Sequence, residues 1–381
     1  MKRIITMAAC AAMLAMTGCG PKNPQPAEGS EVGFALSFLQ RANETVDYDQ
    51  NLVVSPYSAG VALSMLAEGA EGQTRAEFDD ALNGCLFRAE DLGSNDSIVV
   101  KSANSVWVGD NFSIKNKYVN LLEKEYDALV TTQNFLDPAT VTAINNWCAE
   151  NTEGKISKVI DRLTSNDVMV LINALYFNAP WQREFDPDCT TDKVFHSVVG
   201  DKEVPMMTQR GKFRYAQYQD CQMIELPYAG GRYAMYVVLP PENWSVDAIL
   251  PYIGESAFDA AMDMLSSREV VLTMPKFKLE TSLILNKALQ KMGVETAFSG
   301  AADFSGIAAT GNLALSMVKQ KCYIDVSEKG TEAAAVTVVN VRLTSAGMNP
   351  VARMTVDRPF LFFIRDIQDG NILFAGKIVN L

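Results

Sequence analysis

Histidine is nearly absent from this sequence, and its scarcity limits the catalytic chemistry available. The 381 residues include one histidine, His196, which stands between Phe195 and Ser197 in a segment expected to be a strand. A Ser-His-Asp or Cys-His catalytic group would have to use it. The sequence has no Gly-x-Ser-x-Gly, His-Glu-x-x-His, Gly-x-Gly-x-x-Gly or Gly-x-x-x-x-Gly-Lys-Ser/Thr motif. We expect a packing or surface role for His196, no catalytic residues, and a protein that is not an enzyme.

Paired cysteine motifs are missing as well. Two of the seven cysteines, Cys10 and Cys19, fall in the N-terminal segment, which leaves five. An odd number at irregular spacing, without Cys-x-x-Cys, favours neither a disulfide framework nor a zinc site. The remaining five are expected to be buried thiols: Cys85, Cys148, Cys189, Cys221 and Cys322. We predict no metal and no cofactor.

Clusters of basic residues and long apolar runs are also lacking. The formal net charge is -12, and no dense run of Lys and Arg occurs. Because binding phosphates needs clustered cations, nucleic acid is not an expected partner. After the N-terminal segment, no run reaches the 18 or so apolar residues of a membrane-spanning helix. Any membrane contact would therefore have to come from the N-terminus.

Residues 1–19 have the pattern of a targeting segment. Lys2 and Arg3 form a basic start, an apolar run extends from Ile4 to Met16, and Thr17-Gly18 precede Cys19. Small residues directly before a cysteine resemble a bacterial lipoprotein cleavage site, in which Cys19 would become the lipidated first residue. Met16 stands where Leu is usual, so plain secretion remains an alternative. We expect an exported protein, lipid-anchored at the envelope or surface of a bacterium, or secreted.

The rest of the chain is expected to form one α+β domain. Residues 20–30 read as an extended tether, and no linker or repeat interrupts residues 31–381. Ser30 and Ser55-Pro56 are typical helix starts, and Thr74 with Glu77 predicts a capping box. The apolar run Val168 to Phe177 predicts a strand in the middle of a covered sheet. Helices come mostly early and strands mostly late, which favours the α+β class over alternating βα units.

A second strand-like stretch, residues 327–345, has an unusual end. From Thr331 to Leu343, one parity set contains only Thr, Ala, Val and Leu, while the other contains Glu332, Asn340 and Arg342. This alternation predicts a strand with one buried face. Residues 345–350 nevertheless read as an exposed loop. An ordinary strand, or a helix in the Ala-rich part, would also fit the pattern.

Several blocks of the sequence resemble the serpins, the serine-protease-inhibitor family. Residues 328–335 (EKGTEAAA) look like the serpin hinge, and residues 354–364 (MTVDRPFLFFI) match the C-terminal signature of the family at every position. Similar blocks occur at residues 51–58, 173–181 and 275–280, so the resemblance covers about residues 31–381. It implies the serpin fold, with three β-sheets, about nine helices and an exposed reactive-centre loop.

The resemblance also implies suicide inhibition of serine proteases, and possible activity against cysteine proteases, by a metastable monomer. A protease would attack the loop, and the cleaved loop would then enter the main sheet as a new strand. The hinge residues would be Glu328, Gly330, Thr331, Ala333, Ala334 and Ala335. Non-inhibitory serpins often break this pattern, whereas here the only departure is Val336, where Ala or Gly is preferred.

Family spacing places the attacked bond at Thr344-Ser345, which suits an elastase-like or subtilisin-like protease. Arg342-Leu343 is the alternative bond and would suit a trypsin-like protease, and Met348 is a third possibility. Two other function classes stay open. One is a non-inhibitory serpin that acts as a binding protein or chaperone, and the other is a tethered sugar- or ligand-binding lipoprotein.

The resemblance assigns four residues to the region where the main sheet opens: Ser55, Asn173, Trp181 and Gln320. Their alternative roles are core packing and, for Ser55, capping a helix. Gln320 stands where serpins usually have a hydrogen-bonding histidine. An amide can donate and accept as a neutral imidazole can, but it does not titrate. Opening of the sheet is therefore expected to lack pH control through residue 320.

Overall fold

The computed structural model describes residues 29–90, 92–95, 98–309, 313–331 and 351–381. These residues form eight α-helices, close to the nine expected from the resemblance. The helices are α1 (Glu31–Asn43), α2 (Pro56–Gly69), α3 (Gly72–Ala81), α4 (Asn116–Tyr126), α5 (Pro138–Asn151), α6 (Val246–Ile249), α7 (Glu255–Met264) and α8 (Asn286–Lys291). Ser30 and Ser55 cap α1 and α2 as predicted, because their hydroxyl oxygens accept hydrogen bonds from the N–H groups of Gly33 and Ser58.

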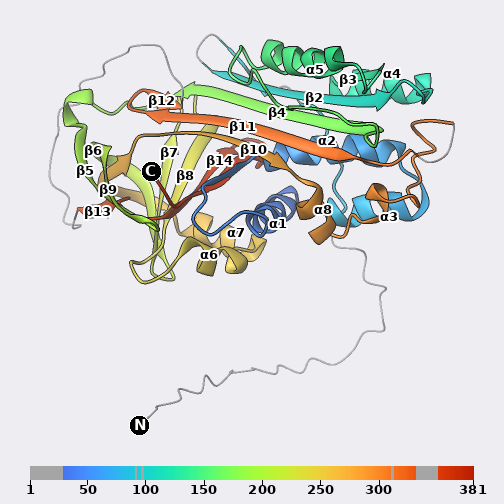
Figure 1. Cartoon of the computed structure of the whole chain (residues 1–381). Helices are drawn as coiled ribbons and strands as arrows, with labels where there is room; N and C mark the ends of the chain where they lie inside the picture. Colours follow the sequence, from blue (N-terminus) through green and yellow to red (C-terminus); the bar gives the residue numbers. More distant parts are fainter. Residues whose placement is uncertain (1–28, 91, 96–97, 310–312, 332–350) are drawn as a thin grey trace, which may run out of the picture.

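Six strands form the upper sheet of Figure 1, in the order β10-β11-β12-β4-β2-β3. They are β2 (Val99–Gly109), β3 (Leu129–Gln133), β4 (Met169–Pro180), β10 (Phe277–Ile284), β11 (Met317–Ser327) and β12 (Gly330–Thr331). β4 is the strand expected from the run Val168 to Phe177. Its first nine residues are buried, since helices cover both faces of this sheet.

The other nine strands are hydrogen-bonded into a second sheet, in the order β1-β15-β14-β8-β7-β6-β9-β13, with β5 on β6. They are β1 (Leu52–Val54), β5 (Thr191–Ser197), β6 (Gly200–Tyr218), β7 (Cys221–Pro227), β8 (Tyr233–Leu239), β9 (Ser266–Pro275), β13 (Ala352–Thr355), β14 (Phe360–Asp366) and β15 (Ile372–Ile378). The described strands thus form two hydrogen-bonded sheets where three were expected. The reason is the 19-residue strand β6, which pairs with β5 at its start, with β9 through its middle and with β7 at its end, so that it joins the two expected sheets.

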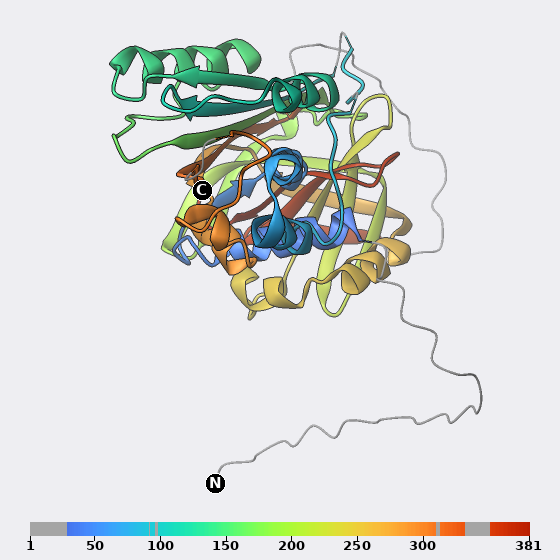
Figure 2. The same ribbon diagram turned by 90° about the vertical axis from the view of Figure 1, so that its right-hand side faces the viewer.

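The main hydrophobic core lies between the two sheets, where α2 is the central element. Every residue of α2 except Glu68 is buried, as expected for a helix that is apolar on all sides. Figure 1 shows α2 beneath the six-stranded sheet, with α5 on the opposite face, and Figure 2 shows the same layers from the side. No helix in the described part of the chain is long and apolar enough to cross a membrane.

The predicted capping box at Thr74 and Glu77 is wrong. α3 begins two residues earlier, at Gly72, so Thr74 already lies inside the first turn. The Thr74 hydroxyl oxygen accepts a hydrogen bond from the N–H of Asp303. The Glu77 carboxylate accepts hydrogen bonds from the backbone and hydroxyl of Thr296. Both side chains therefore fasten α3 to a distant segment.

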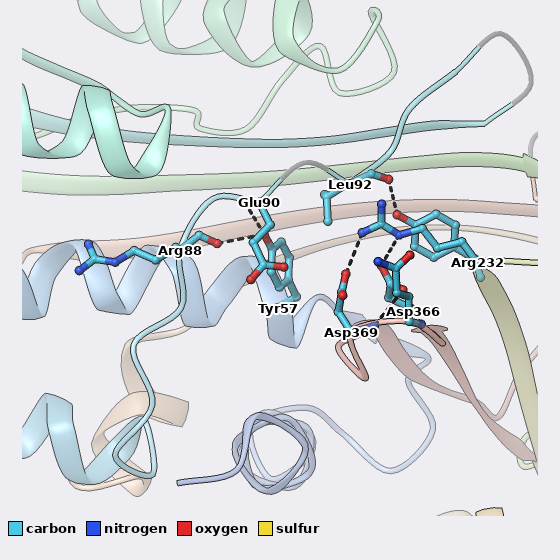
Figure 3. Close-up of polar contacts among 9 residues, drawn as sticks. Tyr57, Arg88, Glu90, Leu92, Arg232, Asp366 and Asp369 are labelled. Carbon is cyan, nitrogen blue, oxygen red and sulfur yellow. Dashed lines mark hydrogen bonds and ion pairs between the residues drawn. The ribbon is translucent and has the colours of Figure 1, made fainter. Parts of the chain in front are cut away.

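Polar contacts also fasten the segment that follows α3 (Figure 3). The hydroxyl of Tyr57, on α2, donates to the carbonyl of Arg88 and accepts from the N–H of Glu90. Further along the segment, the carbonyl of Leu92 accepts a hydrogen bond from the hydroxyl of Tyr233. Beside it, Arg232 forms ion pairs of 2.7 Å with buried Asp366 and 2.9 Å with Asp369. The segment is thereby tied to the helix that lies between the sheets.

Candidate functional site

The hinge residues Gly330 and Thr331 form a strand of their own within the six-stranded sheet. This hinge strand, β12, is antiparallel to both neighbours and lies between β4 and β11 (Figure 1). Thr331 pairs with Val326 of β11 and with Ala179 of β4, and Gly330 pairs with Ser327 and Pro180. The first hinge residues are thus already seated in the gap between β4 and β11.

Gly330 is required by the backbone geometry of the hinge strand. Its φ is +151°, a conformation that residues with a side chain rarely adopt. A Cβ atom built there would lie 2.2 Å from the carbonyl oxygen of Ala179 and 2.6 Å from Cα of Pro180. Because both contacts are with backbone, the neighbours could not move aside cheaply. Only glycine fits between β4 and β11 at this position.

The next residue, Thr331, points into the core. Its side chain is fully buried, and its hydroxyl group is 2.6 Å from that of Tyr228. Burial raises the pKa of Tyr228, so the phenol stays protonated and can share this hydrogen bond. The Tyr228 ring stacks on Trp181 with a centroid distance of 4.5 Å. The hydroxyl of Thr331 is therefore satisfied in an otherwise apolar pocket.

Trp181, the fourth residue that the resemblance assigned to sheet opening, holds the backbone that leads into the hinge strand. Its indole N–H donates to the carbonyl of Ser327 at 2.9 Å, and its backbone N–H donates to the carbonyl of Lys329 at 2.8 Å. The N–H of Phe185 donates to the carbonyl of Glu328 at 2.8 Å. The turn between β11 and β12 is thus anchored on the segment that follows β4.

Glu328 supplies the charged contact of the hinge. Its carboxylate pairs with the ammonium group of Lys276 at 2.8 Å and accepts a hydrogen bond from the Thr190 hydroxyl at 2.9 Å. Burial alone would raise the pKa of Glu328, but the hydrogen bonds to Lys276 and Thr190 outweigh it and hold the pKa below its ordinary value. The carboxylate is therefore ionised at neutral pH.

Beyond the hinge strand, the gap is closed by direct pairing of β4 with β11. Residues Met317–Cys322 pair in parallel with Val170–Leu175. Three residues of each strand lie between this pairing and the hinge strand: 323–325 of β11 and 176–178 of β4. On the side that faces the gap, they have no pairing partner among the described residues. A longer inserted strand would have to separate the six parallel pairs.

A buried polar cluster lies where these two strands meet. Its five members are at most 2% exposed, and we call them the opening cluster: Ser55, Ser58, Asn104, Asn173 and Gln320. The Gln320 amide accepts from the N–H of Ser55 at 2.9 Å and donates to its carbonyl at 2.9 Å. It also donates to the amide oxygen of Asn173 at 2.8 Å. Three of the residues that the resemblance assigned to sheet opening are thus brought together, one of them from the N-cap of α2 and two from the facing strands.

Asn173 connects the rest of the opening cluster. Its amide nitrogen donates to the carbonyl of Ser58 at 2.9 Å and to the amide oxygen of Asn104 at 2.6 Å, and it also contacts the hydroxyl of Ser58. All five side chains are amides or hydroxyls, so none titrates near neutral pH. The lack of pH control through residue 320 stays a prediction.

Three residues of this site were not expected from the sequence: Ser58, Asn104 and Tyr228. Asn104 gave a usable signal, since it is a polar residue in a strand whose next five residues are buried. Ser58 looks like an ordinary residue of the first turn of α2. Tyr228 gave no local signal, because its partner Thr331 is 103 residues away.

The remaining expected site residues lie outside the described part of the chain. These are the small-residue run Ala333, Ala334 and Ala335, the bonds at Thr344-Ser345 and Arg342-Leu343, the third candidate Met348, and the lipid attachment residue Cys19. They remain predictions.

The one histidine and the five described cysteines differ in how far they are exposed. His196 lies on strand β5, where its side chain is 57% exposed and its Nδ1 is 2.8 Å from Asp201. This hydrogen bond raises the pKa of His196. Cys148 and Cys322 are buried as expected, but Cys189 is exposed and Cys85 and Cys221 are only half-buried. The expectation for Cys189 is wrong because it ends a short surface turn, Pro187–Cys189.

Comparisons with known proteins agree with this geometry. The family model Serpin (serine protease inhibitor) matches residues 30–381. Human Serpin B8 is 33% identical over 365 residues, which cover 90% of this chain and 96% of Serpin B8. A serpin-like protein of Thermococcus kodakarensis is 33% identical over 352 residues, with 88% and 82% covered.

Solved structures with the same fold include a thermophilic serpin and a thyroxine-binding protein. The native state of Tengpin, a thermophilic serpin, matches with a TM-score of 0.86 and 28% identity, over 95% of this chain and 96% of Tengpin. Human thyroxine-binding globulin, solved in complex with thyroxine, matches with a TM-score of 0.82 and 27% identity, over 92% of this chain and 97% of the globulin. The α+β fold, with a hinge strand seated in its six-stranded sheet, and the family match over residues 30–381 show that this chain belongs to the serpin family, whose members are generally protease inhibitors and not enzymes.

Proposed function

We propose that this protein inhibits serine endopeptidases by trapping them covalently, with the cleaved loop inserted between β4 and β11. The observation that carries the proposal is the hinge strand, because Gly330 and Thr331 already occupy the entrance of that gap. A strand that enters a sheet between two neighbours gains backbone hydrogen bonds on both sides. The loop therefore has a place to go once it is cut.

The trapping chemistry is that of an interrupted hydrolysis. The protease serine oxygen bonds to the carbonyl carbon of Thr344, the Thr344-Ser345 peptide bond breaks, and the amine of Ser345 leaves with a proton. Water would normally release the acyl group. If the loop inserts first, it carries the acylated protease away and distorts a catalytic site whose geometry must hold to about 1 Å.

The strand registers define how far insertion would extend. If β12 continues its pairing, Ala333 meets Ile324 and Phe177, and each further residue moves one position back along both neighbours. The ladder reaches the first residue of β11 at Asn340 and that of β4 at Val341. The inserted strand would thus comprise about ten new residues. Moving Thr344 from the hinge to the far end is a displacement of about 40 Å, at roughly 3.3 Å per residue.

The residues that would enter suit the positions that receive them. Ala333 and Ala335 would face the same side as Thr331, beside Phe177 and Leu175 of the core. Neither carries a charge that would have to be desolvated, a step that costs several kcal/mol. Insertion can therefore be fast enough to compete with hydrolysis.

The target class follows from the scissile bond. Thr344 after Leu343 suits an elastase-like or subtilisin-like pocket, and Arg342 would direct the inhibitor to trypsin-like proteases. Since the extrapolated ladder ends at Val341, cleavage after either residue leaves a complete inserted strand. Both bonds can then support trapping, and the same loop could also acylate cysteine proteases.

We further propose a monomer tethered through lipid on Cys19, or secreted, with extracytoplasmic proteases as its partners.

The test mixes mature protein with pancreatic elastase, subtilisin and trypsin in separate reactions. We expect a complex that survives SDS, together with a C-terminal peptide that begins at Ser345 and separates from the protein on denaturation. A peptide that begins at Leu343 would move the specificity to Arg342. Clean cleavage with fully active protease would contradict the proposal and favour a non-inhibitory carrier, the role that the name of thyroxine-binding globulin indicates for that relative.

A further inference from the structure

A cavity of about 380 Å³ opens beside the hinge, between the segment that follows β4 and strands β6, β7 and β9. We call it the hinge cavity. Its apolar lining is at most 9% exposed and consists of Trp181, Phe185, Phe213 and Leu226, with Pro227 alongside. Its volume falls in the range of small-molecule sites, and aromatic walls are typical of them. The described walls therefore leave room for one or two rings.

Cations surround this apolar lining. Arg183, Lys212 and Arg214 all border the hinge cavity, and their side chains are solvent-accessible at its rim. The Arg183 guanidinium lies against the backbone of Gly211 and donates to the carbonyl of Arg210 at 2.7 Å. Its remaining donors are available to a ligand.

The positive charge of the rim is largely uncompensated. The one carboxylate in the wall, Glu225, is paired with Arg214 at 2.7 Å. Neither Arg183 nor Lys212 forms an ion pair with any described residue. Gln209, also in the wall, donates its amide nitrogen to two carbonyls, while its buried amide oxygen has no partner among the described residues. The cavity is thus apolar inside, cationic at its mouth, and short of one hydrogen-bond donor.

We propose that the hinge cavity is a binding site for a small aromatic anion, such as a fused-ring carboxylate, whose occupancy slows loop insertion. The rings would replace water against Trp181 and Phe213. The carboxylate would lie between Arg183 and Lys212 and accept hydrogen bonds from both cations. Such charge-assisted hydrogen bonds are stronger than those between neutral groups. Charge complementarity with the two unpaired cations is what selects an anion over a neutral aromatic.

The link to insertion comes from the position of the cavity. One wall, Trp181 to Phe185, holds the backbone of Ser327, Glu328 and Lys329 by three hydrogen bonds. The other walls belong to the nine-stranded sheet. A ligand that touches both would hold the end of β4 in its present place, and β4 must separate from β11 for the sheet to open. Ligand binding would thus stabilise the closed sheet relative to the state in which β4 and β11 have separated. This effect rests on the proposed inhibitory function, whereas binding does not.

The binding test uses 2-naphthoate as the probe and the neutral 2-naphthylmethanol as its reference. The chain has four tryptophans, so the indole N–H of Trp181 can be followed by NMR alongside the other three. We expect naphthoate to shift the Trp181 signal selectively, and the neutral compound to bind at least about fivefold more weakly. No selective shift at millimolar naphthoate would overturn the proposal.

Variants locate the anion contact. Arg183→Gln and Lys212→Gln should each weaken naphthoate binding about tenfold, whereas the control Lys117→Gln, on α4 at the other end of the molecule in Figure 1, should not. Equal affinity in all three variants would show that the anion binds elsewhere and overturn the assignment.

The effect of the ligand on loop insertion is measured as the number of inhibitor molecules consumed per protease trapped, with and without saturating naphthoate. We expect naphthoate to raise this number at least about twofold in the parent and to leave it unchanged in Arg183→Gln. Binding without any change would overturn the coupling to insertion. A protein that traps no protease even without naphthoate would defeat the proposed function and leave the binding result standing.

Discussion

At the scale of single residues, Gly330 is the most constrained position of the hinge. A Cβ there would collide with the backbone of Ala179 and Pro180, and φ is positive. We predict that Gly330→Ala displaces the hinge strand and raises the number of inhibitor molecules consumed per trapped protease several-fold, because insertion starts later. The assay is titration of a fixed amount of protease. Lys329→Ala, whose backbone contact to Trp181 is preserved, is the control. Equal effects of both changes would contradict the argument.

Glu328 makes the stability of the hinge depend on pH. Its hydrogen bonds to Lys276 and Thr190 lower its pKa in the folded protein. A carboxylate whose pKa is lowered on folding stabilises the folded protein at every pH above its ordinary pKa of about 4.5. This stabilisation is lost as the pH falls through the lower pKa of the folded protein. We predict that Glu328→Gln lowers the free energy of unfolding at pH 7 by about 1 kcal/mol.

The difference between parent and Glu328→Gln should shrink as the pH falls below about 4.5. Urea unfolding monitored by tryptophan fluorescence, at a series of pH values, measures it. A difference that persists at pH 3 would mean that the variant acts through packing and not through the ionised carboxylate. The opening cluster should contribute no such pH dependence, because amides and hydroxyls alone compose it.

At the scale of elements, the opening cluster determines what the entering strand must provide. Extending the register of β12 places Thr337 between Asn173 and Gln320, which now bond to each other at 2.8 Å. A hydroxyl can both donate and accept, so Thr337 can bridge the two amides after they part. An apolar side chain would leave them buried without partners, at about 1–3 kcal/mol.

We therefore predict that Thr337→Val, which keeps the shape of threonine, raises the number of inhibitor molecules consumed per protease. Thr337→Ser, which keeps the hydroxyl, should stay close to the parent. The measurement is the same protease titration, with the complex and the cleaved inhibitor quantified on SDS gels. If the valine variant traps protease as well as the serine variant, the strand does not follow the extrapolated register.

Elements with a strong local pattern could be predicted from the sequence, and elements fixed by distant partners could not. The apolar run Val168 to Phe177 predicted β4 in the middle of a sheet, because burial on both faces leaves no polar parity set. The capping box failed because Thr74 and Glu77 bond to residues more than 200 positions away. Two of the three expected sheets are joined into one among the described strands because β6 is long enough to pair with both.

The functional site divides in the same way. The resemblance named Ser55, Asn173 and Gln320, and the structure places them within one network. It did not name Asn104 or Tyr228, whose importance comes from side-chain contacts across the fold. The hinge pattern predicted that Gly330 is a hinge residue. Its position in the gap could be seen only once β4 and β11 were placed beside it.

At the scale of the whole molecule, the described state is one in which the six-stranded sheet has only begun to accept its additional strand. Two residues of the hinge pair with both neighbours, while six residues of β4 still pair directly with β11. Full insertion would replace these six parallel pairs by about ten residues bonded on both sides, and antiparallel pairing is the slightly more stable kind. The intact protein is thus expected to be less stable than its cleaved form.

We predict that cleavage of the loop by a protease raises the melting temperature by at least roughly 5–10 °C, as expected for a gain of several kcal/mol in a domain of this size. Differential scanning calorimetry of the intact protein and of the cleaved protein, with the peptide of residues 345–381 still bound, measures the shift. Strands β13, β14 and β15 lie in that peptide and are paired within the nine-stranded sheet, so we expect it to remain bound. An unchanged melting temperature would mean that the cut loop stays outside the sheet. The protein would then lack the free-energy difference that trapping needs, whatever protease it meets.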